Sequence, residues 1–196
     1  MKWTIPGTVV ESQREDAQSV EALFSPMFLA GGIVLSQVAN LTGLEPYMVQ
    51  NWVKRGFLSP PQKKRYTLRQ LCRIININML KSVLPMEKIC SMLGYINGHL
   101  DDESDDIIDD SDLYFAFVKV AAQAETLGVD TPEARDALIA ESLAGYVEPV
   151  PGARLRVEQV LRIMLTAWAS AQLRKQAEDM LSDLTDGTGN QMKKGD

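Results

Sequence analysis

The sequence predicts a mainly helical protein, and three features of the chain support this fold class. Apolar residues recur at intervals of three and four over most of the chain, which is the spacing of one face of an α-helix. The segments with this pattern end at glycine or proline or begin at a capping Ser or Thr, as helices do. Strand signals are confined to the ends of a short stretch, "FLSPPQKKRY", in which Pro60 and Pro61 forbid a helix.

Residues 1–30 are predicted to be an N-terminal extension with one helix. The chain opens with "WTIPG" and a polar run, "ESQREDAQS", so we expect residues 1 to about 20 to be loose. Residues 22–44 are uncharged over nearly the length of a membrane span, but their strongly apolar part, "MFLAGGIVL", is too short to cross. We therefore expect a buried helix, a glycine loop and the next helix, with no membrane partner.

Residues 31–98 contain the clearest helix boundaries. "VLSQVANLTG" predicts a short helix that ends at Gly43, and "EPYMVQNWVKRG" predicts a second that begins at Pro46 and ends at Gly56. "FL" and "KRY" on either side of the prolines could pair as a small hairpin or run extended. Thr67 then caps a third helix, and a further short helix ends at Gly94.

Positive charge is concentrated in the same region of an acidic chain. The 196 residues carry a net charge of -6, yet residues 46–86 contain eight Lys or Arg and no Asp or Glu. Local positive potential is what a polyanion such as DNA requires. Two short helices joined by a Thr-Gly turn, a basic loop and a third helix make the pattern of a winged helix-turn-helix. A solvated basic face with no ligand is the alternative interpretation.

Residues 35–74 resemble the DNA-binding domain of the MerR family, in which a short helix ending in "LTG" precedes a recognition helix that opens with Pro, and "RRY" precedes a Ser or Thr cap. "INMLKSVLPMEKICSML" also resembles that family. "MVQNWVKRGFLSPPQKKRY" more closely resembles a bacterial MerR-like family described only as a domain of unknown function. The wing is shorter here, Glu45 stands in place of the capping Ser, and Tyr47 and Gln50 stand where arginines are common. The resemblance implies a transcriptional regulator.

The recognition helix 46–55 presents the side chains of its first turns to base edges, which predicts base contacts by Tyr47, Gln50 and Asn51. Basic and polar residues around it, including the wing 59–66, are predicted to contact phosphates, which orient a protein without reading sequence. These predicted phosphate contacts are Ser36, Gln37, Lys54, Arg55, Lys63, Lys64, Arg65, Tyr66 and Arg69. Stacking beneath the wing is the alternative for Tyr66. Exposed polar residues with no DNA contact are the alternative for Gln50 and Asn51.

Residues 99–112 are predicted to be an exposed acidic linker or the outer rim of a helix, because eight Asp or Glu between Asp101 and Asp112 repel one another in a compact setting. A calcium-binding loop is a rival interpretation, but the spacing lacks the central glycine and closing Glu of an EF-hand. A third interpretation is self-masking, in which the aspartates fold onto residues 63–69 as a phosphate mimic.

Residues 113–184 are predicted to be a helical C-terminal domain. One helix is expected over residues 113–127. A second is expected to be capped by Thr131, with Pro132 in its first turn, and a third, with a long apolar side, over residues 154–184. The last twelve residues, 185–196, read "TDGTGNQMKKGD" and are predicted to be a flexible tail. We expect these helices to join two copies in a homodimer.

The favoured function is a cytoplasmic, dimeric regulator bound to double-stranded DNA at a pseudo-palindromic site. The alternative is a protein-interaction adaptor that uses the same fold and the C-terminal helices without binding DNA. An enzyme, a cofactor and a metal site are not expected. His99 is the single histidine, Cys72 and Cys90 lie in apolar helical patterns that suit buried thiols in a reducing compartment, and no glycine-rich phosphate loop follows a strand. No secretory signal is predicted.

Overall fold

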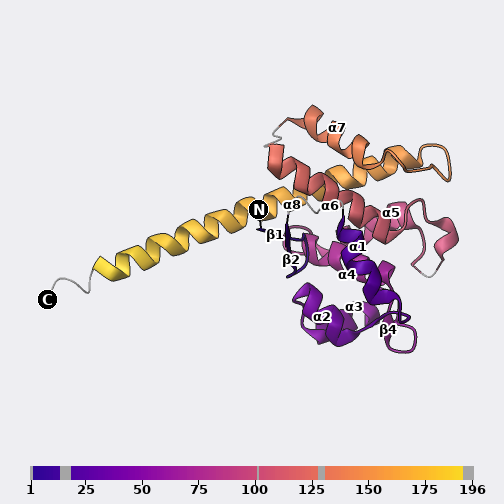
Figure 1. The fold of residues 1–196 in the computed structure, drawn as a ribbon, viewed down its shortest axis with the longest axis horizontal. Coiled ribbons are helices and arrows are strands. Elements are labelled where there is room, and N and C mark those ends of the chain that lie inside the picture. The colour runs from indigo at the N-terminus through magenta and orange to yellow at the C-terminus, as the bar shows by residue number, and fades with distance from the viewer. Residues whose placement is uncertain (1, 14–18, 101, 128–130, 192–196) are drawn as a thin grey trace.

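The structure is a computed structural model that describes residues 2–13, 19–100, 102–127 and 131–191 (Figure 1). It confirms the mainly helical fold class, with 66% of residues helical and strands of only two or three residues. The helices are α1 (Val20–Phe24), the 3-10 helix η2 (Ser25–Phe28), α2 (Leu35–Thr42), α3 (Pro46–Lys54), α4 (Leu68–Leu80), α5 (Met86–Asn97), the 3-10 helix η3 (Glu103–Asp105), α6 (Asp110–Leu127), α7 (Pro132–Ser142) and α8 (Ala153–Gln191). Two antiparallel sheets pair β1 (Lys2–Thr4) with β2 (Glu11–Gln13) and β3 (Ile33–Val34) with β4 (Arg65–Tyr66).

The central element is α4, which packs against α2, α5, α6 and α8. The sequence predicts a helix with one apolar stripe, but residues 70–77 are buried without a break. The stripe that the sequence predicts consists of Leu68, Leu71, Cys72, Ile75 and Met79. Ile74 and Ile77 lie outside it and are fully buried, because helices cover α4 on several sides. Buried residues of the N-terminal, central and C-terminal parts consequently form one hydrophobic cluster.

The N-terminus is ordered where the sequence predicted a loose start, so that prediction is wrong for residues 2–13. β1 and β2 form a hairpin in which Trp3 faces Ser12, and Ile5 beyond the first strand is fully buried. Tyr114 of α6 donates a hydrogen bond to the Pro6 carbonyl at 2.9 Å. Asn78 of α4 donates to the Gly7 carbonyl at 2.9 Å, and the N–H of Val9 donates to the Leu41 carbonyl at 3.0 Å. Burial of apolar side chains and these hydrogen bonds together hold a mostly polar segment on the core. Residues 14–18 lie outside the described part of the chain.

The acidic segment is partly buried, which corrects the prediction of an exposed linker over 99–112. Ile107 and Ile108 are each 6% exposed, and the Asp110 side chain is 1% exposed. The backbone N–H of Ile107 donates to the Ile96 carbonyl of α5 at 2.8 Å. The mutual repulsion of the acids, on which the prediction relied, is offset here because arginines of α4 face them. As a result α6 begins at Asp110 rather than at residue 113.

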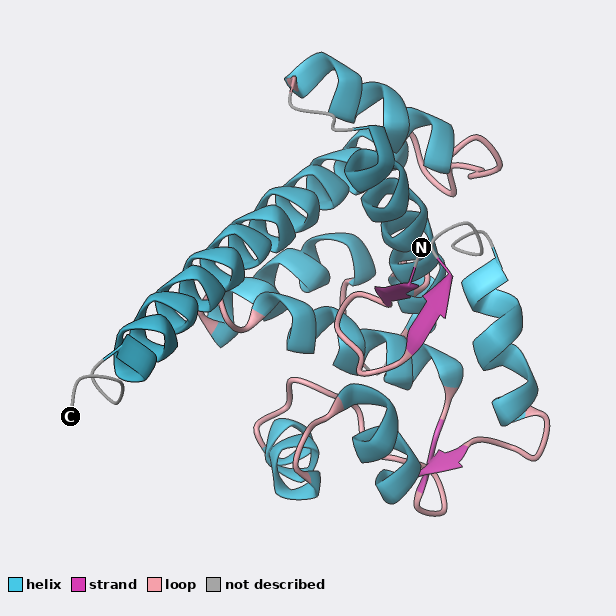
Figure 2. Cartoon of the chain, turned by 60° about the vertical axis from the view of Figure 1, so that its left-hand side comes forward, coloured by secondary structure: helices cyan, strands magenta, loops and turns pink. Residues whose placement is uncertain are grey.

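The C-terminal helices form a layer over α4 and α5, and the last of them leaves the body of the molecule. The rings of Phe117 in α6 and Trp168 in α8 meet edge to face, with centroids 6.1 Å apart. Thr131 caps α7 as predicted, accepting a hydrogen bond from the N–H of Ala134 at 3.3 Å. The described side chains of α8 beyond Trp168 are half-buried or exposed. The C-terminal end of α8 extends away from the other elements in Figure 1 and comes toward the viewer in Figure 2.

Two helices run further than predicted. α5 continues past Gly94 to Asn97, and α8 continues past residue 184 to Gln191, so residues 185–191 are helical rather than part of a flexible tail. Once a helix is nucleated, each added residue gains a hydrogen bond, which favours such extension. Residues 192–196 lie outside the description. No helix in the described ranges has both the length and the apolar run needed to span a bilayer.

Replacing Arg73 with Ala is expected to lower the free energy of unfolding by about 3 kcal/mol, because it removes the nearest cation from the buried Asp110 carboxylate. Urea denaturation measures this change. The double variant Arg73→Met with Asp110→Leu should recover most of the loss, since a packed apolar pair often replaces a buried ion pair without cost. A double variant as unstable as the single one would contradict this role for the pair.

Candidate nucleic-acid interface

The helix pair α2 and α3 is joined by a tight turn, as the sequence predicts. Gly43 has a φ of 69°, and its N–H donates to the Ala39 carbonyl at 2.8 Å. A Cβ at this position would lie 2.7 Å from Cγ1 of Val9 in the N-terminal hairpin loop, so the turn also requires glycine for space. Val49 and Trp52 hold the inner side of α3 in the core.

The outer side of α3 carries the residues predicted to contact bases. Tyr47 is 67% exposed, and Gln50, Asn51 and Lys54 are also exposed. These positions are three, four and seven residues apart, so they occupy one face of the helix. The structure therefore brings together an aromatic ring, two amides and an ammonium group, all facing solvent.

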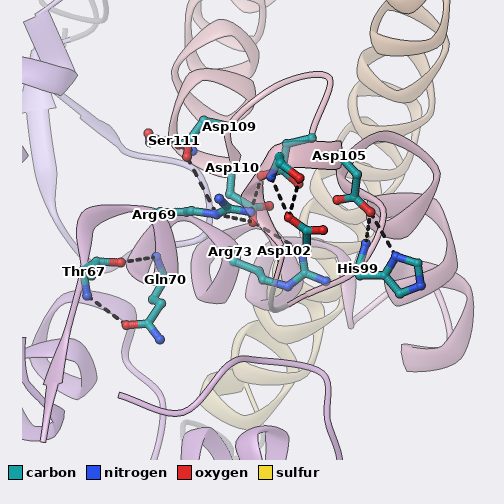
Figure 3. A network of polar contacts seen from close by, with 12 residues as sticks. Thr67, Arg69, Gln70, Arg73, His99, Asp102, Asp105, Asp109, Asp110 and Ser111 are labelled. Carbon is teal, nitrogen blue, oxygen red and sulfur yellow. Dashed lines mark hydrogen bonds and ion pairs between the residues drawn. The ribbon is translucent and has the colours of Figure 1, made fainter. Parts of the chain in front are cut away.

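The loop after α3 is held from beneath by α4. The Gln70 Nε2 lies 3.0 Å from the Ser59 carbonyl and 3.1 Å from the Pro60 carbonyl, and Arg73 Nε donates to the Phe57 carbonyl at 3.1 Å. Thr67 and Gln70 cap α4 reciprocally, each side chain bonding the other's backbone N–H (Figure 3). The cap predicted at Thr67 is confirmed.

The strand that returns from the loop pairs with residues outside it. Ile33 pairs with Tyr66 and Val34 with Arg65, so "KRY" does not form a hairpin with "FL". Tyr66 is 3% exposed, so the structure favours the alternative of packing beneath the loop over a phosphate contact for this residue. Its ring belongs to the core because the second residue of a short strand at the edge of the helix pair faces inward.

A two-residue turn at the tip of the loop contains two lysines in an unfavourable backbone conformation. The N–H of Arg65 donates to the Gln62 carbonyl at 2.8 Å, and between them Lys63 and Lys64 have φ values of 48° and 64°. Positive φ at both central residues is the signature of a type I′ turn, where Asn-Gly is preferred. This conformation costs a non-glycine residue roughly 1–2 kcal/mol. We call residues 62–65 the lysine turn; both lysine side chains are exposed.

Two arginines of the basic region, Arg65 in the lysine turn and Arg55 after α3, are exposed and also contact the protein. Arg65 Nη1 donates to the Gly32 carbonyl at 2.7 Å, which places its guanidinium beside the base of the turn. Arg55 Nη2 lies 3.2 Å from Oε1 of Glu87, and its guanidinium covers the Phe57 ring at 4.6 Å. The Arg55 side chain is still 49% exposed. Both guanidinium groups are thus oriented by the protein before any ligand arrives.

Ser36 and Gln37 lie at the start of α2 and are exposed. The Gln37 Oε1 accepts a hydrogen bond from the N–H of Val34 at 3.0 Å and so caps its own helix. The structure therefore gives Gln37 a structural role beside the predicted phosphate contact.

Arg69 contacts carboxylates of the acidic segment (Figure 3). Its Nη2 pairs with Asp106, and its Nε lies 3.7 Å from Asp109 and 3.9 Å from Asp110. The Arg69 side chain is only 17% exposed. The structure therefore corrects the predicted phosphate contact at Arg69: the carboxylates of this chain take the place that a phosphate was expected to occupy.

The carboxylates of this cluster are perturbed by burial. Desolvation raises the pKa of Asp106 to about 6, although the Arg69 guanidinium opposes the shift. Burial also raises the pKa of Asp110, against the attraction of Arg73, whose Nη1 lies 3.3 Å away. The cluster joins Arg69 and Arg73 of α4 to Asp110 at the start of α6. The acids neutralise Arg69 and Arg73 but leave the lysine turn exposed to solvent.

Comparison with protein families matches residues 32–117 to the domain of unknown function DUF1836. The match supports the resemblance to a family known only by such a description, and it spans the lysine turn, α4 and the acidic cluster. The chain is also similar to the uncharacterized protein YkrK of Bacillus subtilis (strain 168), with 25% identity over 166 residues, which cover 78% of this chain and 70% of YkrK. No solved structure gives a significant match.

Sequence reasoning missed the backbone of the lysine turn and the burial of the acidic cluster. The turn carried no signal in the sequence, because Lys63 and Lys64 stand where Asn-Gly would mark a type I′ turn. No local signal marks Asp106 and Asp110 either, because their arginine partners lie 37 residues away along the chain.

The double variant Lys63→Asn with Lys64→Gly is expected to raise the free energy of unfolding by about 1 kcal/mol, because it supplies the residues that the turn prefers. Thermal or urea unfolding measures the gain. The matched control, Lys63→Ala with Lys64→Ala, removes the same charges but keeps the strain, so it should show no such gain. Equal stabilities of the two double variants would contradict the strain at this turn.

Proposed function

We propose that this protein is a transcriptional regulator that binds duplex DNA with α3 and the lysine turn. The observation that carries the proposal is the lysine turn itself. A chain with a net charge of -6 keeps two exposed lysines at backbone positions that favour Asn and Gly. Residues with a strained backbone conformation at a protein surface are often functional. The two residues strained here are lysines, a residue type that binds phosphate.

The arrangement of the helix pair supports a winged helix-turn-helix of the MerR type. In such a unit the second helix enters the major groove and its first turns reach base edges. α3 offers Tyr47, Gln50 and Asn51 on its outer face, and an amide side chain can bond adenine through both donor and acceptor. In this proposal the loop and lysine turn serve as the wing.

The flanking cations supply contacts to phosphate. Lys54, Arg55, Lys63, Lys64 and Arg65 are exposed, so about five contacts are available to each copy. Neutralising phosphates releases counterions, with a slope of roughly -0.9 in log affinity against log salt concentration per contact. Five contacts correspond to a slope of roughly -4.5 per copy. Arg69 and Tyr66 are left out of this set because of their partners and burial.

A protein-interaction adaptor is the second candidate, and one observation favours it. α8 exposes several apolar side chains beyond Trp168, among them Leu173 at 66% and Leu184 at 68%. Such a surface serves protein contacts rather than DNA contacts. An adaptor predicts tight association with another protein and an affinity for DNA that neutral variants of the lysine turn do not change.

Binding to a fluorescent duplex of mixed sequence is expected to weaken as salt rises from 50 to 200 mM, with a log–log slope of roughly -4 to -5 per copy. Fluorescence anisotropy measures it. Lys63→Ala with Lys64→Ala should lower the magnitude of the slope by roughly 2, because two phosphate contacts are lost.

The control for this experiment is the double variant Lys88→Ala with Lys175→Ala. It removes two exposed lysines outside the proposed interface and changes the net charge by the same amount as the variant of the lysine turn. This variant should retain the slope. Equal loss in both variants would indicate attraction to net charge alone, and an affinity that salt does not change would contradict DNA binding through phosphates.

A further inference from the structure

A cavity of about 680 Å³ lies between α6, the acidic segment and the loop that follows α7. One of its walls is a single face of α6, whose lining residues are spaced three and four apart. They are Asp112, Phe115, Ala116 and Lys119. Residues 106–109 and the loop between residues 142 and 149 supply other walls, together with Glu21 of α1 and Arg69 of α4. Small-molecule sites in proteins have volumes of roughly 300–1,000 Å³, so this cavity has the size of a ligand site.

The walls of the cavity are held together by contacts within the protein. The Tyr146 hydroxyl donates a hydrogen bond to the Ile107 carbonyl, which joins the loop after α7 to the acidic segment. Arg154 of α8 fixes the other end of this loop, because its Nη1 donates to the Leu143 carbonyl at 3.0 Å. A cavity that is formed in advance loses little conformational freedom when a ligand binds, which favours binding.

Part of the lining is apolar and belongs to the core. Ile107, Ile108 and Phe115 are each 6% exposed, Leu143 is 3% exposed, and the half-buried ring of Tyr146 lies among the lining residues. Apolar groups of a ligand that contact this surface leave water, which is favourable. A hydrated metal ion would use none of it, so the apolar lining favours an organic ligand.

The cavity also has an excess of negative charge. Four carboxylates line it against two basic side chains: Glu21, Asp106, Asp109 and Asp112 against Arg69 and Lys119. Burial raises the pKa of Asp112, and the charges of Asp109 and Glu21 raise it further, although Lys119 opposes them. These carboxylates therefore disfavour one another's ionised form, and a cation bound among them would relieve the repulsion.

Asp106 adds a buried charge that its protein partner compensates only in part. Its side chain is 7% exposed and pairs with Arg69 through Oδ2, whereas Oδ1 accepts no hydrogen bond from the described residues. Desolvation raises the pKa of this carboxyl to about 6 even with the guanidinium beside it. A positive charge in the cavity would stabilise the ionised form through space.

We propose that this cavity binds an organic cation, with an ammonium group among the carboxylates and an apolar body against the core residues of the lining. The ammonium group would lie among Glu21, Asp109 and Asp112, where its N–H groups have acceptors. The apolar body would contact Phe115 and Leu143. Binding of this ligand requires no DNA, so it is tested separately from the proposed function.

Three small molecules that share an indole ring but differ in charge test the proposal: cationic tryptamine, uncharged tryptophol and anionic indole-3-acetate. Each is added to the full chain without DNA while amide chemical shifts are followed by NMR. Tryptamine should bind with a dissociation constant on the order of 1 mM and shift residues 106–119 and 142–147. Tryptophol should bind at least about fivefold more weakly, and indole-3-acetate more weakly still.

Equal affinities for tryptamine and tryptophol would overturn the proposal, because charge would then play no part. The absence of tryptamine-induced shifts in residues 106–119 and 142–147 would also overturn it. Calcium chloride should displace tryptamine no better than sodium chloride of the same ionic strength. Stronger displacement by calcium would assign the carboxylates to a metal ion and contradict an organic ligand.

The double variant Glu21→Gln with Asp112→Asn should weaken tryptamine binding at least about fivefold, because it removes two of the four carboxylates. Both side chains are exposed, so the fold should be retained. The matched control, Glu133→Gln with Asp179→Asn, removes two exposed carboxylates outside the cavity and should bind tryptamine as the unchanged chain does. An equal loss in both double variants would indicate attraction to net charge alone and overturn the site.

Discussion

The packing of helices around α4 is the constraint on which the remaining architecture depends, and within it the buried Arg73 of α4 pairs with Asp110 of α6. Arg73 also donates to the Phe57 carbonyl, so one side chain fixes the loop after α3 and the start of α6 to the same point of α4. With helices around α4, the helix pair, the basic loop and the C-terminal layer share one core. A surface held this rigidly can present α3 and the lysine turn in a fixed relation, as groove recognition requires.

The charges of the central region divide into two groups with different surroundings. Arg69 and Arg73 face acids of the same chain and stabilise the fold, whereas Lys54, Lys63 and Lys64 face solvent. Aspartates of the acidic segment do contact Arg69, one of the residues that the self-masking hypothesis named, and here they serve as its structural partners. In the proposed function, the cations that remain exposed bind phosphate. The strained backbone of the lysine turn is retained because Asn and Gly, which would relieve the strain, would remove the two lysine side chains.

Much of this fold could be predicted from sequence because its boundaries are local. Gly43, Pro46 and the cap at Thr67 determine helix ends by their own backbone chemistry, and α3 follows directly from them. The acidic segment could not be predicted in this way, since like charges favour exposure unless distant arginines meet them. The N-terminal hairpin likewise depends on contacts with α6 and α4 that no neighbouring residue encodes.

The central claim is that α3 and the lysine turn together form a surface for DNA. Amide chemical shifts of the full chain, followed by NMR as a duplex is added at low salt, test it most directly. The account predicts that the largest shifts occur at residues 47–51 and 62–65, with little change along residues 169–184. Shifts confined to residues 169–184, or no shift at the lysine turn at saturating duplex, would contradict it.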